Sequence, residues 1–167
     1  MKNFTFMAGT LLFAGLALIS CSSQTDADKY ASRCIGSTGQ SASFKVDGSE
    51  VLVSDPDLTY TTNNSEVSNI LTLKGADNSK LVFKFTGSDI KSYSVAGYYG
   101  GTFKDKYGKE YNVDTGSVVL NCSGSDSGTR YMSGTFQATF EEVYSSGSPD
   151  AITISSGVFE NVSSELD

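Results

Sequence analysis

The chain has 167 residues, with 12 Lys and Arg against 19 Asp and Glu, which gives a formal net charge of −7 at pH 7. An acidic chain with scattered charges argues against binding nucleic acid and against binding anionic lipid through a basic patch. There is no histidine, which excludes Ser-His-Asp and Cys-His catalysis and imidazole-ligated zinc sites. Because no phosphate-binding loop, dinucleotide fingerprint or EF-hand loop occurs either, we expect no cofactor and no metal site.

The first twenty residues differ from the rest of the chain. Met1-Lys2-Asn3 is a short, weakly positive start, and residues 4–19 are apolar or small throughout. This layout is typical of a secretory signal, and the apolar run is short for a helix that spans a bilayer. We therefore expect residues 1–20 to form a signal helix that is removed on export.

The end of this signal, Leu18-Ile19-Ser20-Cys21, resembles the lipobox of bacterial lipoprotein precursors. The resemblance implies that a diacylglyceryl group is attached to the Cys21 thiol and that the chain is cut between Ser20 and Cys21. A single acyl chain holds a protein only marginally, at about 0.8 kcal/mol per buried methylene, so the several chains of such an anchor are needed for lasting attachment. The alternatives are an ordinary secretory signal and an uncleaved anchor.

Acyl chains on Cys21 would make the membrane a partner of the protein and place it in the cell envelope. The expected location is the outer membrane of a Gram-negative bacterium. Residues 21–33 have almost no bulky apolar side chain, so we expect a flexible tether after the lipidated cysteine. Residues 34–167 are long enough for a single domain with its own core.

From about Cys34 onward, apolar and polar residues alternate in short segments separated by Gly, Asn and Asp. Asp47-Gly48 is the strongest hairpin signal, and residues 75–79 form a second hairpin-length loop. Gly157 is expected to mark a bulge that turns Phe159 inward. The clearest period-two stripe consists of Met132, Gly134, Phe136, Ala138 and Phe140.

About nine or ten short strands in one domain indicate an all-β fold, either an antiparallel β-sandwich or a barrel. We predict the β-sandwich, because the connections at residues 54–58 and 145–150 look longer than the tight turns of an up-and-down barrel. A lipocalin-like β-barrel is the alternative.

Two segments carry a second family resemblance. The opening segment is Ser43-Phe44-Lys45-Val46-Asp47-Gly48, and the closing pair is Ser133–Phe136 with Ile152–Phe159. These segments resemble small all-β lipoproteins of the Bacteroidota type, which are mostly of unknown function. The resemblance implies a fold and a location, and it transfers no active site.

One group of aromatic residues suggests recognition of a ligand. The segment Tyr98-Tyr99-Gly100-Gly101 is followed by Tyr107 and Tyr111. Tyrosines beside glycines on a β scaffold can form a platform for sugar rings or peptides. Tyr98, Tyr99, Tyr107 and Tyr111 are therefore the candidate ligand-binding residues for a glycan or a peptide. Tyrosine is also a favoured strand residue, so part of this group is expected in the core.

The acidic residues offer two weaker hypotheses. Glu141-Glu142 is the obvious carboxylate pair for a hydrolase, but neighbours in a strand point to opposite faces and cannot flank one bond. Residues 54–57 and 105–107 could supply oxygen ligands to calcium, although ordinary turn aspartates explain them better. We expect no catalytic residue and predict a non-enzymatic binding or structural role.

Lipidation of Cys21 would leave Cys34 and Cys122 as the remaining cysteines. An even number of thiols in an exported domain predicts a disulfide between them. In the chain-entropy model, closing a loop of roughly ninety residues contributes about 4–5 kcal/mol. The alternative is two separate buried thiols, because Cys122 belongs to an apolar stripe. Nothing in the sequence specifies an oligomeric state.

Overall fold

The computed structural model describes residues 39–63, 66–97, 99–143 and 147–166, and these residues confirm the all-β prediction. Their nine strands are β1 (Ser41–Val46), β2 (Ser49–Asn63), β3 (Glu66–Gly75), β4 (Lys80–Thr86), β5 (Ser92–Ser94), β6 (Gly101–Lys104), β7 (Glu110–Asp126), β8 (Thr129–Glu142) and β9 (Ala151–Glu165). The predicted signal helix, Cys21 and the tether lie outside the described residues. Within the described part, no helix has the length and apolar character that crossing a bilayer requires.

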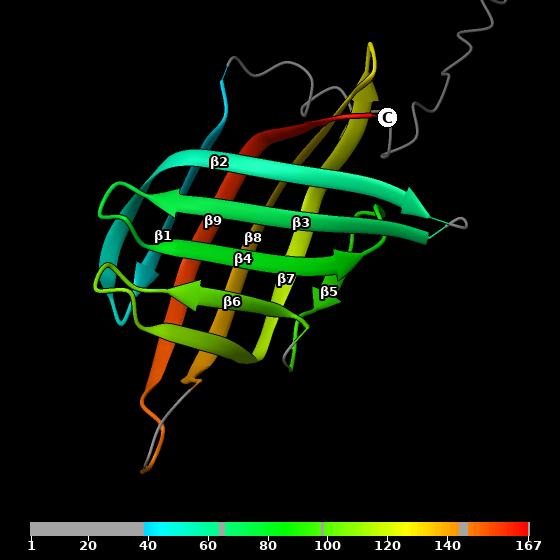
Figure 1. The fold of residues 1–167 in the computed structure, drawn as a ribbon. Coiled ribbons are helices and arrows are strands. Elements are labelled where there is room, and N and C mark those ends of the chain that lie inside the picture. Colours follow the sequence, from blue (N-terminus) through cyan, green and yellow to red (C-terminus); the bar gives the residue numbers. More distant parts are fainter. Residues whose placement is uncertain (1–38, 64–65, 98, 144–146, 167) are drawn as a thin grey trace, which may run out of the picture.

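The strands close into a barrel, so the predicted β-sandwich is wrong and its barrel alternative is correct. Around the barrel the order is β1-β2-β3-β4-β6-β7-β8-β9, and β9 pairs back onto β1. The short β5 is an extra strand that pairs with β7. Figure 1 shows β2, β3, β4 and β6 passing in front of β7, β8 and β9 at a steep angle, so side chains from both walls meet inside.

The segment that favoured a sandwich is part of a strand. Residues 54–58 belong to β2, where Pro56 lies opposite Leu73 of β3 and a bulge follows Val53. Four residues further on, the Tyr60 backbone N–H donates to Ser164 Oγ at 3.1 Å, away from β3. Because N–H groups two and four residues apart in a strand point the same way, the nitrogen of Pro56 also faces away from β3. A proline can therefore sit in this long strand without breaking the ladder.

The second suspected long connection joins β8 to β9. Its ends are brought together by a hydrogen bond at 3.0 Å from the Glu142 N–H to the Asp150 carbonyl. Residues 144–146 lie outside the described part. The connection thus links adjacent antiparallel strands, as in a hairpin.

The hairpin predicted at Asp47-Gly48 is confirmed. Val46 pairs with Ser49, and both turn residues have positive φ, 47° for Asp47 and 83° for Gly48. A two-residue turn with two positive φ angles matches the twist of the flanking strands. The Asp47 carboxylate also accepts the Thr153 N–H at 2.8 Å, which ties this turn to β9.

Apolar side chains at alternate positions of the strands form the core. The stripe Met132, Gly134, Phe136, Ala138 and Phe140 is buried along its whole length, as predicted. Phe83 from the opposite wall packs against Phe136 and Phe140, with ring centroids 5.3 and 6.1 Å apart. Full burial of each such side chain stabilises the fold by about 1.5–3 kcal/mol. The interior of the barrel is one continuous hydrophobic cluster.

The bulge predicted near Gly157 is also present. Pairing of β9 with β8 shifts register between Gly157 and Ile154, and Phe159 is buried with 1 % of its surface exposed. A Cβ atom on residue 157 would overlap the ring of Phe136. Glycine is required here because the phenyl ring occupies the space that any side chain would need.

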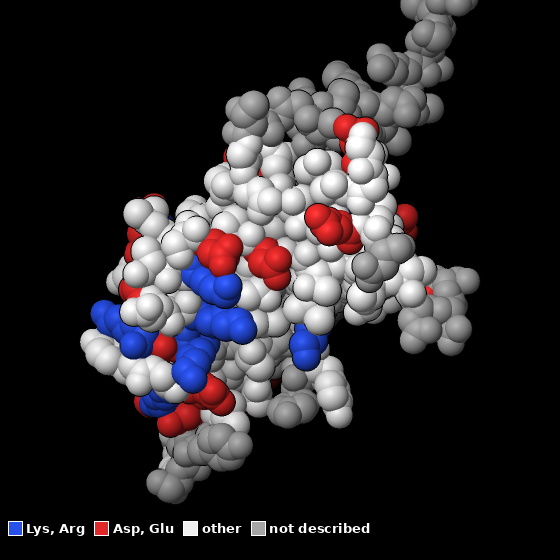
Figure 2. All heavy atoms as spheres, turned by 45° about the horizontal axis from the view of Figure 1, so that its top comes forward, with Lys and Arg blue, Asp and Glu red and all other residues white. Residues whose placement is uncertain are grey.

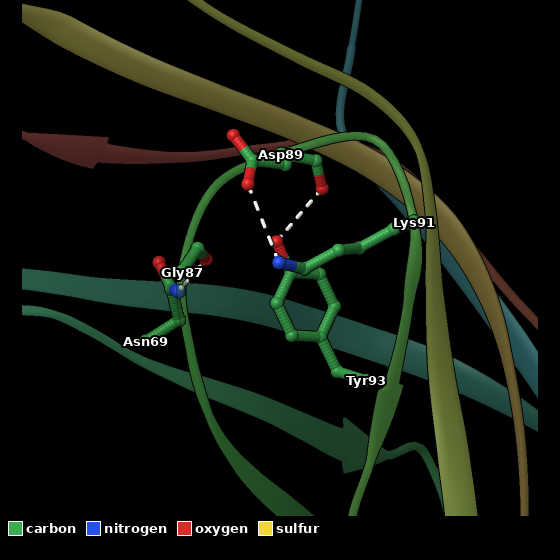
Figure 3. Close-up of polar contacts among 5 residues, drawn as sticks. All are labelled: Asn69, Gly87, Asp89, Lys91 and Tyr93. Carbon is green, nitrogen blue, oxygen red and sulfur yellow. Dashed lines mark hydrogen bonds and ion pairs between the residues drawn. The ribbon is translucent and has the colours of Figure 1, made fainter.

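A buried amide holds the loop between β4 and β5 (Figure 3). Asn69 of β3 is fully buried, and its Nδ2 donates to the Gly87 carbonyl at 2.7 Å and to the Phe85 carbonyl at 3.4 Å. On the same loop, the Tyr93 hydroxyl donates to the Asp89 carbonyl at 2.8 Å. The loop has few apolar side chains, so these side-chain bonds fix its path together with backbone bonds from the Gly87 N–H to Val67 and from the Leu120 N–H to Lys91.

We expect Asn69→Ala to lower the free energy of unfolding by about 1–3 kcal/mol, because it leaves the Gly87 carbonyl without its buried donor. Urea denaturation followed by circular dichroism measures the change. Asn112→Ala on the outer face of β7 is the control and should stay within about 0.5 kcal/mol of the unchanged protein. Equal stability of the two variants would contradict a structural role for the Asn69 amide.

Candidate functional site

The structure separates the tyrosines that the sequence grouped together. Tyr99 lies just before β6 and Tyr107 lies in the β6–β7 turn, and their exposed fractions are 80 % and 84 %. Tyr111 of β7 is buried, with 5 % exposed. Tyr98 lies outside the described residues. The two exposed tyrosines line different depressions, so they do not form one platform.

Tyr111 is a core residue. Its ring packs against Phe103 with 6.1 Å between centroids, and Lys109 Nζ lies 5.5 Å from its ring centre. Burial raises the pKa of the Tyr111 phenol above its ordinary value. The expectation that part of the tyrosine group belongs to the core is confirmed at this position.

Tyr99 belongs to a groove on the outer wall of the barrel. The groove has a volume of about 550 Å³ and lies over β4, β6 and β7. Its cationic character follows from alternation in β4, since Leu81, Phe83 and Phe85 are buried and Lys80 and Lys84 lie on the opposite, outer face. It is lined by Lys80, Val82, Lys84, Tyr99, Thr102, Phe103, Lys104, Glu110, Tyr111, Asn112 and Val143.

Close backbone packing places Tyr99 at the rim of this groove. A Cβ atom on Gly101 would overlap the carbonyl oxygen of Val82, so the chain can enter β6 this tightly only with glycine. The preceding Gly100 accepts the Lys84 N–H at 2.9 Å through its carbonyl. Gly100-Gly101 therefore presses the chain against β4 and leaves the side chain of Tyr99 on the outside.

Lysines from three strands come together beside Tyr99. Lys74 of β3 lies directly opposite Lys80 of β4, which lies directly opposite Lys104 of β6. We call Lys74, Lys80, Lys104 and the nearby Lys84 the lysine row. Figure 2 shows Lys and Arg gathered on this side of the barrel with acidic residues at their flanks. In the sequence these charges look scattered, because strand register decides which lysines meet.

Acidic side chains flank the lysine row. Lys74 Nζ is 2.6 Å from Asp55 Oδ2, and Lys104 Nζ is 3.4 Å from Glu110 Oε1. The hydrogen bond and the charge of Asp55 raise the pKa of Lys74. Among the described residues, no carboxylate forms an ion pair with Lys80 or Lys84. The groove thus carries two cationic side chains, Lys80 and Lys84, that form no ion pair with a carboxylate of the described residues.

A second depression lies at one end of the barrel, among the β1–β2, β3–β4 and β6–β7 turns, and includes Tyr107. Four carboxylates line it, from Asp47, Glu50, Asp77 and Asp105. Three of them hold turns. Asp47 accepts the Thr153 N–H described above, Asp77 accepts the Ser79 N–H at 3.0 Å, and Asp105 accepts the Tyr107 N–H at 2.8 Å.

The pKa of Asp77 does not fit the role of a general acid. Burial raises the pKa of its carboxyl, but hydrogen bonds from Ser79 outweigh burial and hold the pKa below its ordinary value. A general acid in a glycosidase needs the opposite shift. Asp105, which the sequence offered as a calcium ligand, is likewise engaged with turn N–H groups. Among the described residues, no group of three or more Cys, Asp or Glu is arranged to hold a metal ion.

The Glu141-Glu142 pair is arranged as the strand geometry predicts. Glu141 is exposed, whereas Glu142 is partly buried and lies 3.0 Å from Lys109 Nζ. The same ammonium group is 2.6 Å from Asp150 Oδ2. Hydrogen bonds to Asp150 and Glu142 raise the pKa of Lys109 above its ordinary value. This ion-pair group ties the start of β7 to the β8–β9 connection.

Cys122 of β7 is buried and disulfide-bonded. The other two cysteines of the chain, Cys21 and Cys34, lie outside the described residues. The specific pairing of Cys122 with Cys34 stays a prediction.

Comparison of the chain with protein-family models, curated proteins and solved structures finds no match. The site must therefore be interpreted from its own geometry.

We expect Tyr111→Ala and Tyr99→Ala to differ sharply in stability. Truncating the buried ring of Tyr111 should lower the free energy of unfolding by about 3–5 kcal/mol, as for other buried aromatic side chains. Tyr99→Ala, at an exposed position, should stay within about 0.5 kcal/mol. Thermal or urea melts of the two variants test this, and a large loss in Tyr99→Ala would mean that its ring supports the fold.

Proposed function

We propose that the protein is a lipid-anchored protein of the cell envelope that binds a carbohydrate in the groove over β4, β6 and β7. The observation that carries this proposal is Tyr99, whose ring is 80 % exposed at the rim of a groove lined by polar and cationic side chains. An exposed aromatic ring offers an apolar surface to the face of a sugar ring. Side chains such as Asn112 and Thr102 can exchange hydrogen bonds with sugar hydroxyls.

The position of the groove favours a sugar over an extended peptide. Peptides commonly add a strand to a free sheet edge and are held by backbone hydrogen bonds. The groove lies instead over the face of β4, β6 and β7, and β6 is paired on both sides. Recognition on such a face depends on side chains, which suits a ligand rich in hydroxyl groups.

The filled interior supports an external site. Phe44, Phe83, Phe103, Phe136, Phe140 and Phe159 are all buried within one cluster inside the barrel. A ligand inside would have to displace these rings, whereas the groove needs no rearrangement. Lys80, Lys84 and Thr102 of the groove stand on hydrogen-bonded strands, so these side chains are held on a rigid support.

We expect the full chain, solubilised in detergent, to bind a subset of saccharides on a mixed glycan and peptide array. Tyr99→Ala should weaken this binding by about 3- to 10-fold, because it removes one aromatic stacking contact. The matched control is Tyr107→Ala, which removes an equally exposed tyrosine outside the groove. Binding to peptides alone, or equal effects of the two variants, would contradict the proposed glycan site.

The anchor part of the proposal rests on the lipobox-like residues Leu18–Cys21. The disulfide at Cys122 supports export, since stable disulfides form mainly in oxidising compartments outside the cytosol. A barrel with its binding groove on the outer wall is also suited to work at a membrane surface, where the ligand approaches from the side facing solvent.

Intact-protein mass spectrometry of the membrane fraction tests the anchor. We expect a chain that begins at Cys21 and carries added acyl mass, and we expect Cys21→Ser to abolish both the added mass and the membrane association. An unmodified chain that begins at another residue would refute lipidation.

A further inference from the structure

We propose that the groove selects an acidic saccharide, one that bears carboxylate or sulfate groups, through the lysine row. This inference rests on the proposed binding of a glycan at the same groove. The four lysines of this row lie on β3, β4 and β6.

Cross-strand register gives the first argument. Lys74, Lys80 and Lys104 are directly opposite one another on three neighbouring strands. In such positions Cβ atoms lie about 4.5–5.5 Å apart, and like charges directly opposite destabilise a sheet. Asp55 and Glu110 offset part of this repulsion, and an anion bound at Lys80 would relieve the rest.

Pairing within the protein gives the second argument. The two outer members of the row, Lys74 and Lys104, have carboxylate partners in Asp55 and Glu110. Lys80 in the centre forms no ion pair among the described residues, nor does Lys84. Both ammonium groups line the same groove, so they give it a local positive charge that suits an anionic ligand.

The spacing of the two unpaired lysines gives the third argument. Lys80 and Lys84 lie on the same face of β4 with Val82 between them, so their Cα atoms are about 13 Å apart along the strand. Val82 provides an apolar floor between two cationic positions, and Tyr99 stands at the rim. This order of cation, apolar surface and cation suits a chain of sugar rings that carries acidic groups at intervals.

The shape of the site separates this ligand from an anionic membrane. A lipid surface is flat and contacts protruding charges, whereas Lys80 and Lys84 line a recessed groove together with Tyr99. Asp55, which pairs with Lys74 outside the groove, would face such a surface and repel it.

The test is calorimetric titration of the full-length protein in detergent. The probes are a galacturonic acid hexasaccharide, its methyl-esterified neutral form, a heparin-derived hexasaccharide and phosphatidylglycerol vesicles. At least one acidic saccharide should bind, methyl esterification should remove any galacturonate binding, and raising NaCl from 50 to 500 mM should weaken the binding.

The variant Lys80→Ala with Lys84→Ala should weaken binding of the acidic saccharide about tenfold or more, because two exposed ion pairs are removed together. The control is Lys45→Ala with Lys106→Ala, which makes the same change in charge outside the groove and should bind as the unchanged protein does. Circular dichroism melts verify that both double variants are folded.

The outcomes separate this inference from the function on which it rests. Equal binding of the esterified and the acidic hexasaccharide would overturn the acidic selectivity and leave glycan binding intact. Binding of neutral glycans on the array, with no binding of any acidic probe, would also overturn the acidic selectivity and leave glycan binding intact. If no saccharide binds, both proposals are overturned. If vesicles bind in a way that depends on Lys80 and Lys84 while no saccharide binds, the ligand of the groove is a membrane surface and not a glycan.

Discussion

The barrel depends on β1, which pairs with β2 through residues 43–46 and with β9 along its other edge. Without this strand the first and last long strands of the sheet would be free edges, and the sheet would stay open. The same strand also contributes to the core through Phe44, whose ring lies 6.4 Å from that of Phe103 and 6.1 Å from that of Phe136. One short segment therefore provides both the backbone closure and a contact between the two walls.

Closure of the barrel determines which side chains remain accessible to a ligand. Inward positions are taken by apolar side chains, and most of the acidic residues near the barrel end are engaged in holding turns, as Asp47, Asp77 and Asp105 are. Polar side chains that neither pack nor hold turns are left on the outer wall. The groove with Tyr99 and the lysine row is made of such residues, because adjacent strands bring their outward side chains into register.

Local features of this fold could be predicted from the sequence, whereas contacts between distant segments could not. The Asp47-Gly48 turn, the stripe that includes Phe136, and the inward position of Phe159 depend on neighbouring residues alone, and all three were found. The sandwich prediction failed because residues 54–58, rich in Ser, Asp and Pro, resemble a loop although they pair with β3.

The candidate site was predictable only in part, for the same reason. The exposure of Tyr99 and the burial of Tyr111 follow from the tight entry into β6 and from the register of β7, and neither is visible in the motif Tyr98–Gly101. Alternation in β4 could have indicated that Lys80 and Lys84 share an outer face. Lys104 lies more than twenty positions from Lys80 along the chain, and the two lysines are neighbours only because β4 pairs with β6. That pairing could not be predicted from the sequence.

The proline in β2 has a consequence for how copies of the protein meet one another. Beyond Val53, β2 pairs with β3 on one side, and its other backbone edge is not paired with β1. An exposed edge of this kind can template pairing with a second chain. Pro56 has no N–H to offer on that edge, and the Tyr60 N–H is already bonded to Ser164. Two of the N–H positions on this edge are thus closed to a second chain, which makes edge-to-edge pairing of two barrels here less favourable.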